Sequence, residues 1–293
     1  MSALAVVSFL AILFNSFAVS SSTTPFILLH GLNNACTHQD VKNLTAQLIT
    51  HSGSPGYCVE VGNGVLSSWF TPMQKQVEIV CNKVKNMKEL QNGYNIVALS
   101  QGNLISRGVI QMCDGGPRVK NYVSLAGPHA GLAAPIHCGS GGFCIFVDWL
   151  VKSAVYTKFV QAHLAISGYL RLPNDMTGYL NGCKFLPMLN NEIPSQRNLT
   201  YKSRFTSLEN LVLIMFEDDL ILVPKETSWF GFYPDGKFEP VLPPQKTKLY
   251  EEDWIGLKML ADSGRVKFIS VGGAHIDLSF DDMLRYVVPY LKA

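Results

Sequence analysis

Tyr94-Asn-Ile-Val-Ala-Leu-Ser100-Gln-Gly-Asn-Leu-Ile-Ser-Arg-Gly-Val-Ile-Gln-Met-Cys113 is the most informative stretch of this sequence. It begins as a short apolar, β-branched run, passes Ser100, and continues with apolar residues at helical spacing, which predicts a buried strand followed by a helix. Ser100 then lies on the corner between them. Such a corner needs small residues two positions away on either side, because strand and helix come into contact there. Ala98 and Gly102 occupy those two positions.

The pattern around Ser100 is G-x-S-x-G with alanine in place of the first glycine. In that arrangement the serine hydroxyl is exposed at the end of a sheet and can act as a nucleophile. The alternative is a serine that only caps the helix after it, since serine is a preferred N-cap residue. The rest of the chain has to decide between the two.

Strand and helix patterns alternate on both sides of Ser100. Short breaks link them, which argues for a mainly parallel central sheet with helices on both faces, an α/β fold. The predicted strands are residues 25–29, 57–61, 94–99, 119–125, 211–216 and 267–271, and the clearest predicted helices are residues 41–50, 73–87, 104–112 and 279–290. Glu251, Glu252 and Asp253 are expected to open a further helix, because acidic residues favour the first helical turn.

The alternation stops between about residues 127 and 207, where glycines and prolines are scattered among short helical pieces. We expect a helical insertion there rather than a second sheet. Its apolar residues would form either a small core of their own or a lid over an apolar groove above Ser100. The aromatic run Trp229-Phe-Gly-Phe-Tyr233 is interpreted as packing rather than as part of a site.

Composition excludes some partners. The 293 residues include 24 Lys and Arg against 22 Asp and Glu, so the chain has no large excess of positive charge that would favour nucleic acid as a partner. Residues 1–22 contain a short apolar block followed by small and polar residues, which predicts a signal peptide and leaves 23–293 as a single domain. Because the block lacks a preceding Lys or Arg, an uncleaved anchor is the alternative. No later apolar run is long enough for an internal membrane span.

Seven cysteines without C-x-x-C spacing favour disulfides over a metal site, and therefore the secretory pathway. Because seven is odd, at least one thiol is free or paired outside the chain. The sequons at Asn43 and Asn198 predict glycosylation and fit the same compartment.

A serine hydroxyl needs an imidazole to accept its proton and a carboxylate to orient that imidazole. The predicted strand 211–216 runs into Glu217, Asp218 and Asp219, and the last strand is followed by His275 in a glycine-rich loop. Serine, acid and histidine thus follow strand ends in the order found in α/β-hydrolases. His129 is the competing histidine, but it precedes the acid.

His30-Gly31 ends the first predicted strand. In a hydrolase the loop after it supplies one backbone amide to the oxyanion, and the residue after the nucleophile supplies the other. Leu32 and Gln101 are the residues at those positions. His30 itself is interpreted as a packing histidine and is assigned no proton transfer.

These motifs together resemble those of the palmitoyl-protein thioesterase family over nearly all of residues 23–293. The combination of Ser-Gln-Gly with Trp-Phe-Gly-Phe-Tyr is specific to that family among hydrolases. The matching segments are His30-Gly31, Ala98-Leu-Ser-Gln-Gly102, Gly127-Pro-His-Ala-Gly131, Trp229-Phe-Gly-Phe-Tyr233, Leu249-Tyr250, Asp253, Gly256-Leu-Lys258 and the His275 loop.

The resemblance implies an α/β-hydrolase fold with Ser100 as nucleophile, His275 as base and Asp219 as acid, and with Leu32 and Gln101 as oxyanion donors. It also implies a lid whose groove holds the acyl chain and disulfides joining Cys81 to Cys113 and Cys138 to Cys144.

The sequence departs from the family's pattern after His-Gly, where Asn33-Asn34 replaces the usual Gly-Asp. Cys36 lacks the adjacent cysteine of some members, so its partner is Cys58 or none. Cys183 is left unassigned.

The expected function is hydrolysis of long-chain acyl thioesters on S-acylated proteins, without a cofactor or metal, in a lysosome, a vacuole or outside the cell. Two alternatives share most of these features. A lipase or carboxylesterase would use the same catalytic residues on an oxygen ester. A hydrolase-fold protein with an idle triad would bind lipid without turnover.

Overall fold

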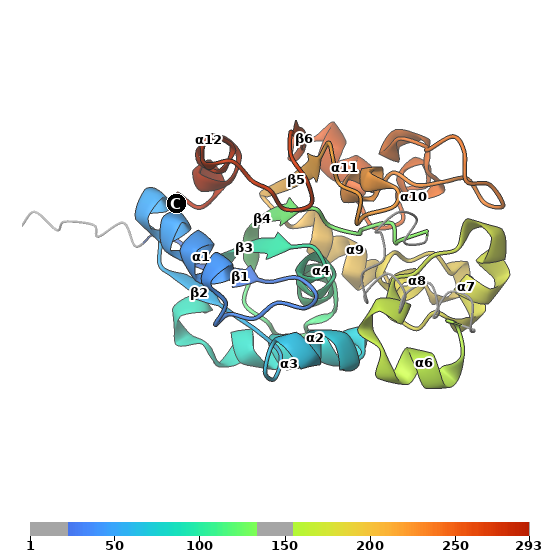
Figure 1. Cartoon of the computed structure of the whole chain (residues 1–293), viewed down its shortest axis with the longest axis horizontal. Coiled ribbons are helices and arrows are strands. Elements are labelled where there is room, and N and C mark those ends of the chain that lie inside the picture. Colours follow the sequence, from blue (N-terminus) through green and yellow to red (C-terminus); the bar gives the residue numbers. More distant parts are fainter. Residues whose placement is uncertain (1–22, 134–154, 293) are drawn as a thin grey trace, which may run out of the picture.

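The computed structural model describes residues 23–133 and 155–292. Its centre is a six-stranded sheet in the order β2-β1-β3-β4-β5-β6, and every neighbouring pair in it is parallel (Figure 1). Parallel strands with covered faces are predicted by the apolar runs in the sequence. The strands are β1 (Phe26–Leu29), β2 (Gly56–Cys58), β3 (Tyr94–Leu99), β4 (Val119–Leu125), β5 (Asn210–Phe216) and β6 (Val266–Val271).

The register of the sheet determines which loops meet. Leu29 of β1 pairs with Ala98 of β3, so the residues after β1 lie beside the residues after β3. Phe216 of β5 pairs with Val271 of β6, which brings the acidic loop beside the loop that carries His275. All four loops leave the carboxyl edge of the sheet, where open α/β sheets carry their sites.

Helices cover both faces of the sheet. α1 (Gln39–Ser52) packs against the C-terminal helical segment, whereas α3 (Met73–Asn86), α4 (Gly102–Met112), α9 (Leu199–Thr206) and α11 (Leu257–Asp262) pack one against the next (Figure 1). The apolar stripe predicted for residues 73–87 faces inward, because Met73, Val77, Val80 and Val84 are all buried.

Between β4 and β5 the described chain is helical and contains no named strand. Its other elements are α6 (Lys158–His163), α7 (Met176–Gly182) and α8 (Leu186–Leu189), with 3-10 turns η2 (Ala165–Gly168), η3 (Pro173–Asp175) and η4 (Pro194–Gln196). Residues 134–154 lie outside the described ranges. The predicted Cys138–Cys144 disulfide falls within them, and the predicted lid falls partly within them, so both stay predictions.

The remaining helices are short. They are α2 (Val65–Phe70), α10 (Lys248–Glu251) and α12 (Phe280–Asp282), the 3-10 turns η1 (Lys88–Leu90), η5 (Lys225–Trp229), η6 (Pro244–Lys246) and η8 (Val288–Tyr290), and the π-helical turn η7 (Met283–Val287). The predicted C-terminal helix is therefore three consecutive helical forms. Pro289 has no amide proton to donate, so a regular α-helix cannot continue through it.

The prediction that Glu251, Glu252 and Asp253 open a helix is wrong. Glu251 ends α10, and α11 begins only at Leu257. Asp253 and Gly256 have φ of 50° and 85°, so the backbone leaves the helical region between the two helices. Asp253 instead accepts a hydrogen bond from the Lys258 amide at 2.9 Å, at the start of α11.

The aromatic run at residues 229–233 contributes to packing. Trp229 meets Phe268 edge to face with ring centroids 6.1 Å apart, and Phe230 and Phe232 are buried. Phe230 also stacks on His129 at a centroid distance of 4.5 Å.

Two disulfides are present among the described residues. Cys81 of α3 is bonded to Cys113, directly after α4, and Cys36 is bonded to Cys58 at the end of β2. Cys183 is buried and free. The pairing of Cys36, which the sequence left open, is therefore with Cys58.

Candidate active site

Ser100 lies on a strained corner between β3 and α4. Its φ is 49°, in the left-handed region that non-glycine residues rarely adopt and that often marks functional sites. Gly102 makes the corner possible, because a Cβ there would come within 2.4 Å of the Leu29 carbonyl oxygen. Gln101 is the N-cap of α4, and no side chain caps that helix. The hydroxyl of Ser100 contacts His275 instead, which removes the helix-cap interpretation.

His275 connects the serine to a carboxylate. Its Nε2 lies 3.0 Å from Oγ of Ser100, and its Nδ1 lies 2.7 Å from Oδ2 of Asp219. Because an ionised carboxylate only accepts, Nδ1 carries the proton and Nε2 is free to accept one from Oγ. The geometry is that of a nucleophile, a base and an orienting acid.

Asp219 is the member of the acidic trio that reaches this histidine. Its side chain is fully buried, and its Oδ1 accepts the backbone amides of Ile221 and Leu222 at 2.9 and 3.0 Å. Asp218 and Glu217 are exposed, and a Glu217 carboxylate oxygen accepts a hydrogen bond from Ser270. The two amides hold Asp219 in one orientation, so its second oxygen always faces the imidazole.

His129 makes other contacts than His275 does and has an unusual pKa. Its Nε2 lies 2.8 Å from Oγ of Ser124, and burial and then the Arg107 cation lower its pKa well below the ordinary value. The ring is fully buried against Phe230. The structure therefore brings His275, and not His129, to Ser100.

The backbone amides of Leu32 and Gln101 are the predicted oxyanion donors. Gly31 lies directly against Ser100, because a Cβ there would be 3.0 Å from Cβ of Ser100. Within the described part of the chain, no acceptor is paired with the amide of Leu32 or of Gln101. Two unpaired amides that face a serine hydroxyl can bind the negative oxygen that forms when the serine attacks a carbonyl.

The unusual Asn33 fits the loop. Its φ of 60° is a conformation that asparagine tolerates better than most side chains. Its amide donates to Oγ of Ser68 at 2.9 Å, and its side-chain oxygen accepts from the indole of Trp69 at 3.1 Å. The departure from Gly-Asp is therefore accommodated by contacts with α2.

Ser68 and Tyr169 were not singled out from the sequence. The carbonyl of Ser68 accepts from Nε2 of Gln101 at 2.8 Å, and the hydroxyl of Tyr169 donates to Oε1 of Gln101 at 2.9 Å. Ser68 thus contacts both sides of the predicted oxyanion site. A six-residue helix and a 3-10 turn carry no periodicity that would have pointed to these two residues.

A cavity of about 220 Å³ opens onto Ser100 and His275. Its walls are mostly apolar and aromatic, which suits a hydrocarbon chain attached to the reacting carbonyl. The other lining residues are Leu32, Asn33, Trp69, Pro128, Leu132, Ile166, Tyr169, Ile221 and Leu222. Leu132, Ile166 and Tyr169 come from the segment between β4 and β5 in which the lid is predicted.

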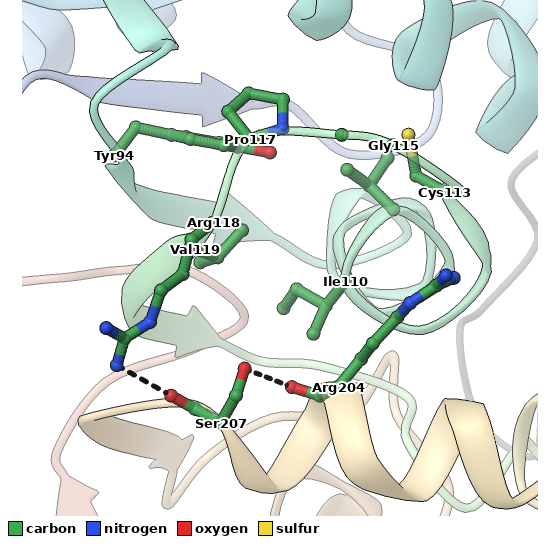
Figure 2. Close-up of a pocket in the computed structure, with 11 residues that line it drawn as sticks. Tyr94, Ile110, Cys113, Gly115, Pro117, Arg118, Val119, Arg204 and Ser207 are labelled. Carbon is green, nitrogen blue, oxygen red and sulfur yellow. Dashed lines mark hydrogen bonds between the residues drawn. The ribbon is translucent and has the colours of Figure 1, made fainter.

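A second cavity of about 220 Å³ lies where β3 begins rather than where it ends (Figure 2). The Tyr94 hydroxyl points into it and is buried, with no hydrogen-bond partner among the described residues. Arg118 and Arg204 stand at its rim, and its lining includes no histidine and no carboxylate. It therefore lacks the acid and base that hydrolysis requires.

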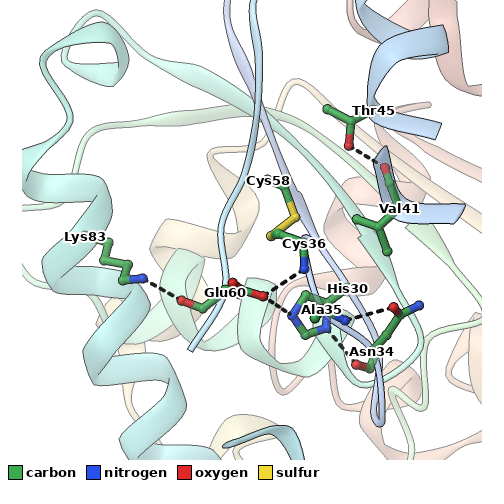
Figure 3. Close-up of a disulfide and its surroundings, with 10 residues drawn as sticks. His30, Asn34, Ala35, Cys36, Val41, Thr45, Cys58, Glu60 and Lys83 are labelled. Atoms are coloured by element: carbon green, nitrogen blue, oxygen red, sulfur yellow. Dashed lines mark hydrogen bonds and ion pairs between the residues drawn. A yellow bond between two sulfur atoms is a disulfide. The ribbon is translucent and has the colours of Figure 1, made fainter. Parts of the chain in front are cut away.

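The side chains of His30, Cys36 and Glu60 each have one potential metal-ligand atom within 4.8 Å of the other two (Figure 3). The sulfur of Cys36 is bonded to Cys58, so it offers no thiolate to a metal.

Asn43 is exposed on α1, and Asn198 caps α9 through Oδ1, which leaves its Nδ2 available for a glycan. Among the described residues, no helix combines the length and apolarity needed to cross a bilayer.

Comparison with known proteins gives a consistent result. The family model described as palmitoyl protein thioesterase matches residues 25–275. Palmitoyl-protein thioesterase 1 of Caenorhabditis elegans is 36% identical over 278 residues, which are 92% of this chain and 92% of that protein. Palmitoyl-protein thioesterase 3 of Dictyostelium discoideum is 34% identical over 285 residues, 94% and 95% of the two chains. Lysosomal thioesterase PPT2-B of Xenopus laevis is 30% identical over 258 residues, 87% and 86% of the two chains.

Proposed function

This chain belongs to the palmitoyl protein thioesterase family and is a thioester hydrolase of the α/β-hydrolase fold, and from that premise we propose that Ser100, His275 and Asp219 remove long-chain acyl groups from S-acylated cysteines. The observation that carries the proposal is the pair of contacts made by His275, 3.0 Å to Oγ of Ser100 and 2.7 Å to Oδ2 of Asp219.

In the first half-reaction Oγ of Ser100 attacks the thioester carbonyl while Nε2 of His275 takes the hydroxyl proton. The imidazolium is stabilised by the Asp219 carboxylate. The carbonyl oxygen becomes an oxyanion held by the amides of Leu32 and Gln101. When the carbon–sulfur bond breaks, the imidazolium returns the proton to the leaving cysteine sulfur, and the acyl group remains on Ser100 as an oxygen ester.

Water completes the cycle. His275 removes a proton from a water molecule that attacks the acyl-enzyme carbonyl, and the same two amides hold the second oxyanion. Breakage of the ester bond returns the proton to Oγ of Ser100 and releases the fatty acid. The apolar cavity beside Ser100 binds the hydrocarbon, so hydrocarbon burial supplies substrate affinity.

The test is a paired assay of an acyl thioester and an oxygen ester of equal chain length. We expect the thioester to be preferred, and Ser100→Ala to reduce hydrolysis to background. Parity or preference for the oxygen ester would favour a lipase or carboxylesterase. Binding of the acyl compound without turnover in the unaltered protein would favour a lipid-binding role.

S-acylated proteins and peptides are the proposed partners, and the secretory pathway is the proposed route. The two described disulfides and the resemblance to a lysosomal thioesterase support that route. We place residues 1–22 as the cleaved signal peptide, Asn43 and Asn198 as glycan sites, and a lysosome, a vacuole or the extracellular space as the destination. Mass spectrometry of the secreted protein, before and after glycosidase treatment, tests the first two assignments.

A further inference from the structure

His30 stands directly before the predicted oxyanion loop and is 7% exposed. Its Nδ1 lies 2.8 Å from the carbonyl oxygen of Gly31. A carbonyl oxygen only accepts hydrogen bonds, so Nδ1 carries the proton in this contact. The imidazole therefore holds the peptide unit that joins Gly31 to Leu32.

The orientation of that peptide decides whether the oxyanion site exists. In a trans peptide the carbonyl and the amide N–H point in opposite directions. The cis bonds of the described chain are at Val223-Pro224 and Glu239-Pro240, so the Gly31–Leu32 bond is trans. With the Gly31 carbonyl directed at His30, the Leu32 amide must face the opposite side.

A carboxylate borders the far side of the same ring (Figure 3). Oε2 of Glu60 lies 3.5 Å from Nε2 of His30 and accepts the backbone amide of Cys36 at 2.8 Å. The Glu60 carbonyl accepts from Nζ of Lys83 at 2.7 Å, and Cys36 is bonded to Cys58. Nε2 makes no hydrogen bond among the described residues, so Glu60 borders that edge of the ring by contact alone. Rotation of the imidazole would break the hydrogen bond from Nδ1 to Gly31.

The following inference rests on the proposed function, in which the Leu32 amide binds the oxyanion. We propose that His30 is a positioning residue for hydrolysis: its Nδ1–H holds the Gly31 carbonyl so that the Leu32 amide faces the oxyanion, and Glu60 keeps the ring in place. His30 touches neither the substrate nor the proton in transit.

Three substitutions at this position separate the two edges of the ring. In His30→Asn the side-chain amide occupies the place of Nδ1 and can still donate to Gly31. In His30→Gln the amide reaches toward Glu60 instead, and His30→Leu keeps bulk but donates to neither. His163→Asn is the matched control, because His163 is exposed and, among the residues that the structure describes, its Nδ1 forms a hydrogen bond only with the Phe159 carbonyl of its own helix.

The measurements are kcat and KM for an acyl thioester, together with the affinities of an acyl trifluoromethyl ketone and of the free fatty acid. The ketone forms a tetrahedral hemiketal oxyanion with Ser100, whereas the fatty acid forms no tetrahedral oxyanion and is held mainly through its hydrocarbon in the cavity. We expect His30→Gln and His30→Leu to lose roughly 10- to 100-fold in kcat and a similar factor in ketone affinity, with KM and fatty-acid affinity within about threefold. His30→Asn should recover most of both losses. Thermal unfolding of each variant separates positioning from misfolding.

Equal kcat for His30→Asn and His30→Leu would overturn the proposal, as would normal ketone affinity in His30→Gln. A rise in KM at constant kcat would also overturn it. These failures differ from failure of the proposed function, which would appear as an unaltered protein without thioesterase activity or as an active Ser100→Ala variant.

Discussion

Oδ1 of Asp219 accepts the amides of Ile221 and Leu222, while Oδ2 of the same carboxylate lies 2.7 Å from Nδ1 of His275. Two backbone donors on one oxygen leave the carboxylate a single orientation. The imidazole is thereby fixed with its proton on Nδ1 and its lone pair directed at Ser100.

Asp219→Asn should lower kcat by about 10³- to 10⁴-fold while leaving the fold intact. The two amides require an oxygen at the position of Oδ1, so the variant must present its NH₂ group to His275. That forces the proton of the imidazole onto Nε2, which then cannot accept the serine proton. Steady-state kinetics with an acyl thioester measures the loss.

The neighbouring Asp218→Asn is the matched control, because that side chain is exposed and the change in charge is identical. It should alter kcat less than about twofold. If both variants lost activity equally, the general negative charge of the loop would explain the effect, and the assignment of Asp219 would be wrong.

Ser68→Ala should lower kcat by about 10-fold with a small change in KM. Its hydroxyl accepts a hydrogen bond from the amide of Asn33, next to Leu32, so its loss frees the loop that carries one proposed oxyanion donor. Ser67→Ala is the control, since in the described part of the chain the half-buried Ser67 hydroxyl forms hydrogen bonds only with the exposed Asn63. An unchanged kcat in Ser68→Ala would show that the loop needs no support from α2.

The pKa of His129 predicts how acid affects stability. Burial and Arg107 lower that pKa well below the ordinary 6.5, so the unfolded chain binds a proton near pH 6.5 that the folded chain refuses. The stabilising contribution is present above pH 6.5 and is lost as the pH falls. Between pH 6.5 and 5 one such group costs at most about 2 kcal/mol.

His129→Gln removes this titration and keeps an amide near Ser124. The variant should lose less unfolding free energy than the unaltered protein when both are taken from pH 7 to pH 5, whatever its stability at pH 7. Urea unfolding at the two pH values measures the difference, with His163→Gln as an exposed control. Equal losses in all three proteins would mean that His129 titrates normally.

Much of the site was accessible from the sequence because parallel strands end at one edge. Ser100, the acidic loop and His275 each follow a recognisable apolar run, so each could be placed at the carboxyl end of a strand and therefore at the same edge of the sheet. Glu60 and Ser68 could not be found in this way. Glu60 lies two residues beyond β2, and α2 has six residues, too few to show a helical period. Tyr169 reaches Gln101 from a different segment, a contact that only the folded chain reveals.

The error at Glu251–Asp253 has a similar origin. Acidic residues favour a helix start, but α10 ends at Glu251 and the backbone becomes left-handed at Asp253, whose φ is 50°. Its side chain pairs with Lys202 of α9 at 2.8 Å, a contact between residues far apart in sequence. Local charge patterns carry no information about such a partner.

The two disulfides are predicted to act differently on catalysis although they are similar in stability. Cys36–Cys58 closes 22 residues and Cys81–Cys113 closes 32, so loss of either should cost about 3 to 4 kcal/mol of unfolding free energy on loop entropy. Only the first holds Cys36 beside Glu60, on the far side of His30 from Gly31.

The Cys36→Ser/Cys58→Ser pair should therefore also lower kcat several-fold at a temperature where it remains folded, whereas Cys81→Ser/Cys113→Ser should keep its kcat. Denaturant unfolding and kinetics on the same preparations measure both quantities. Equal kcat in the two double variants would mean that the disulfide at Cys36 supports the fold without supporting the oxyanion loop.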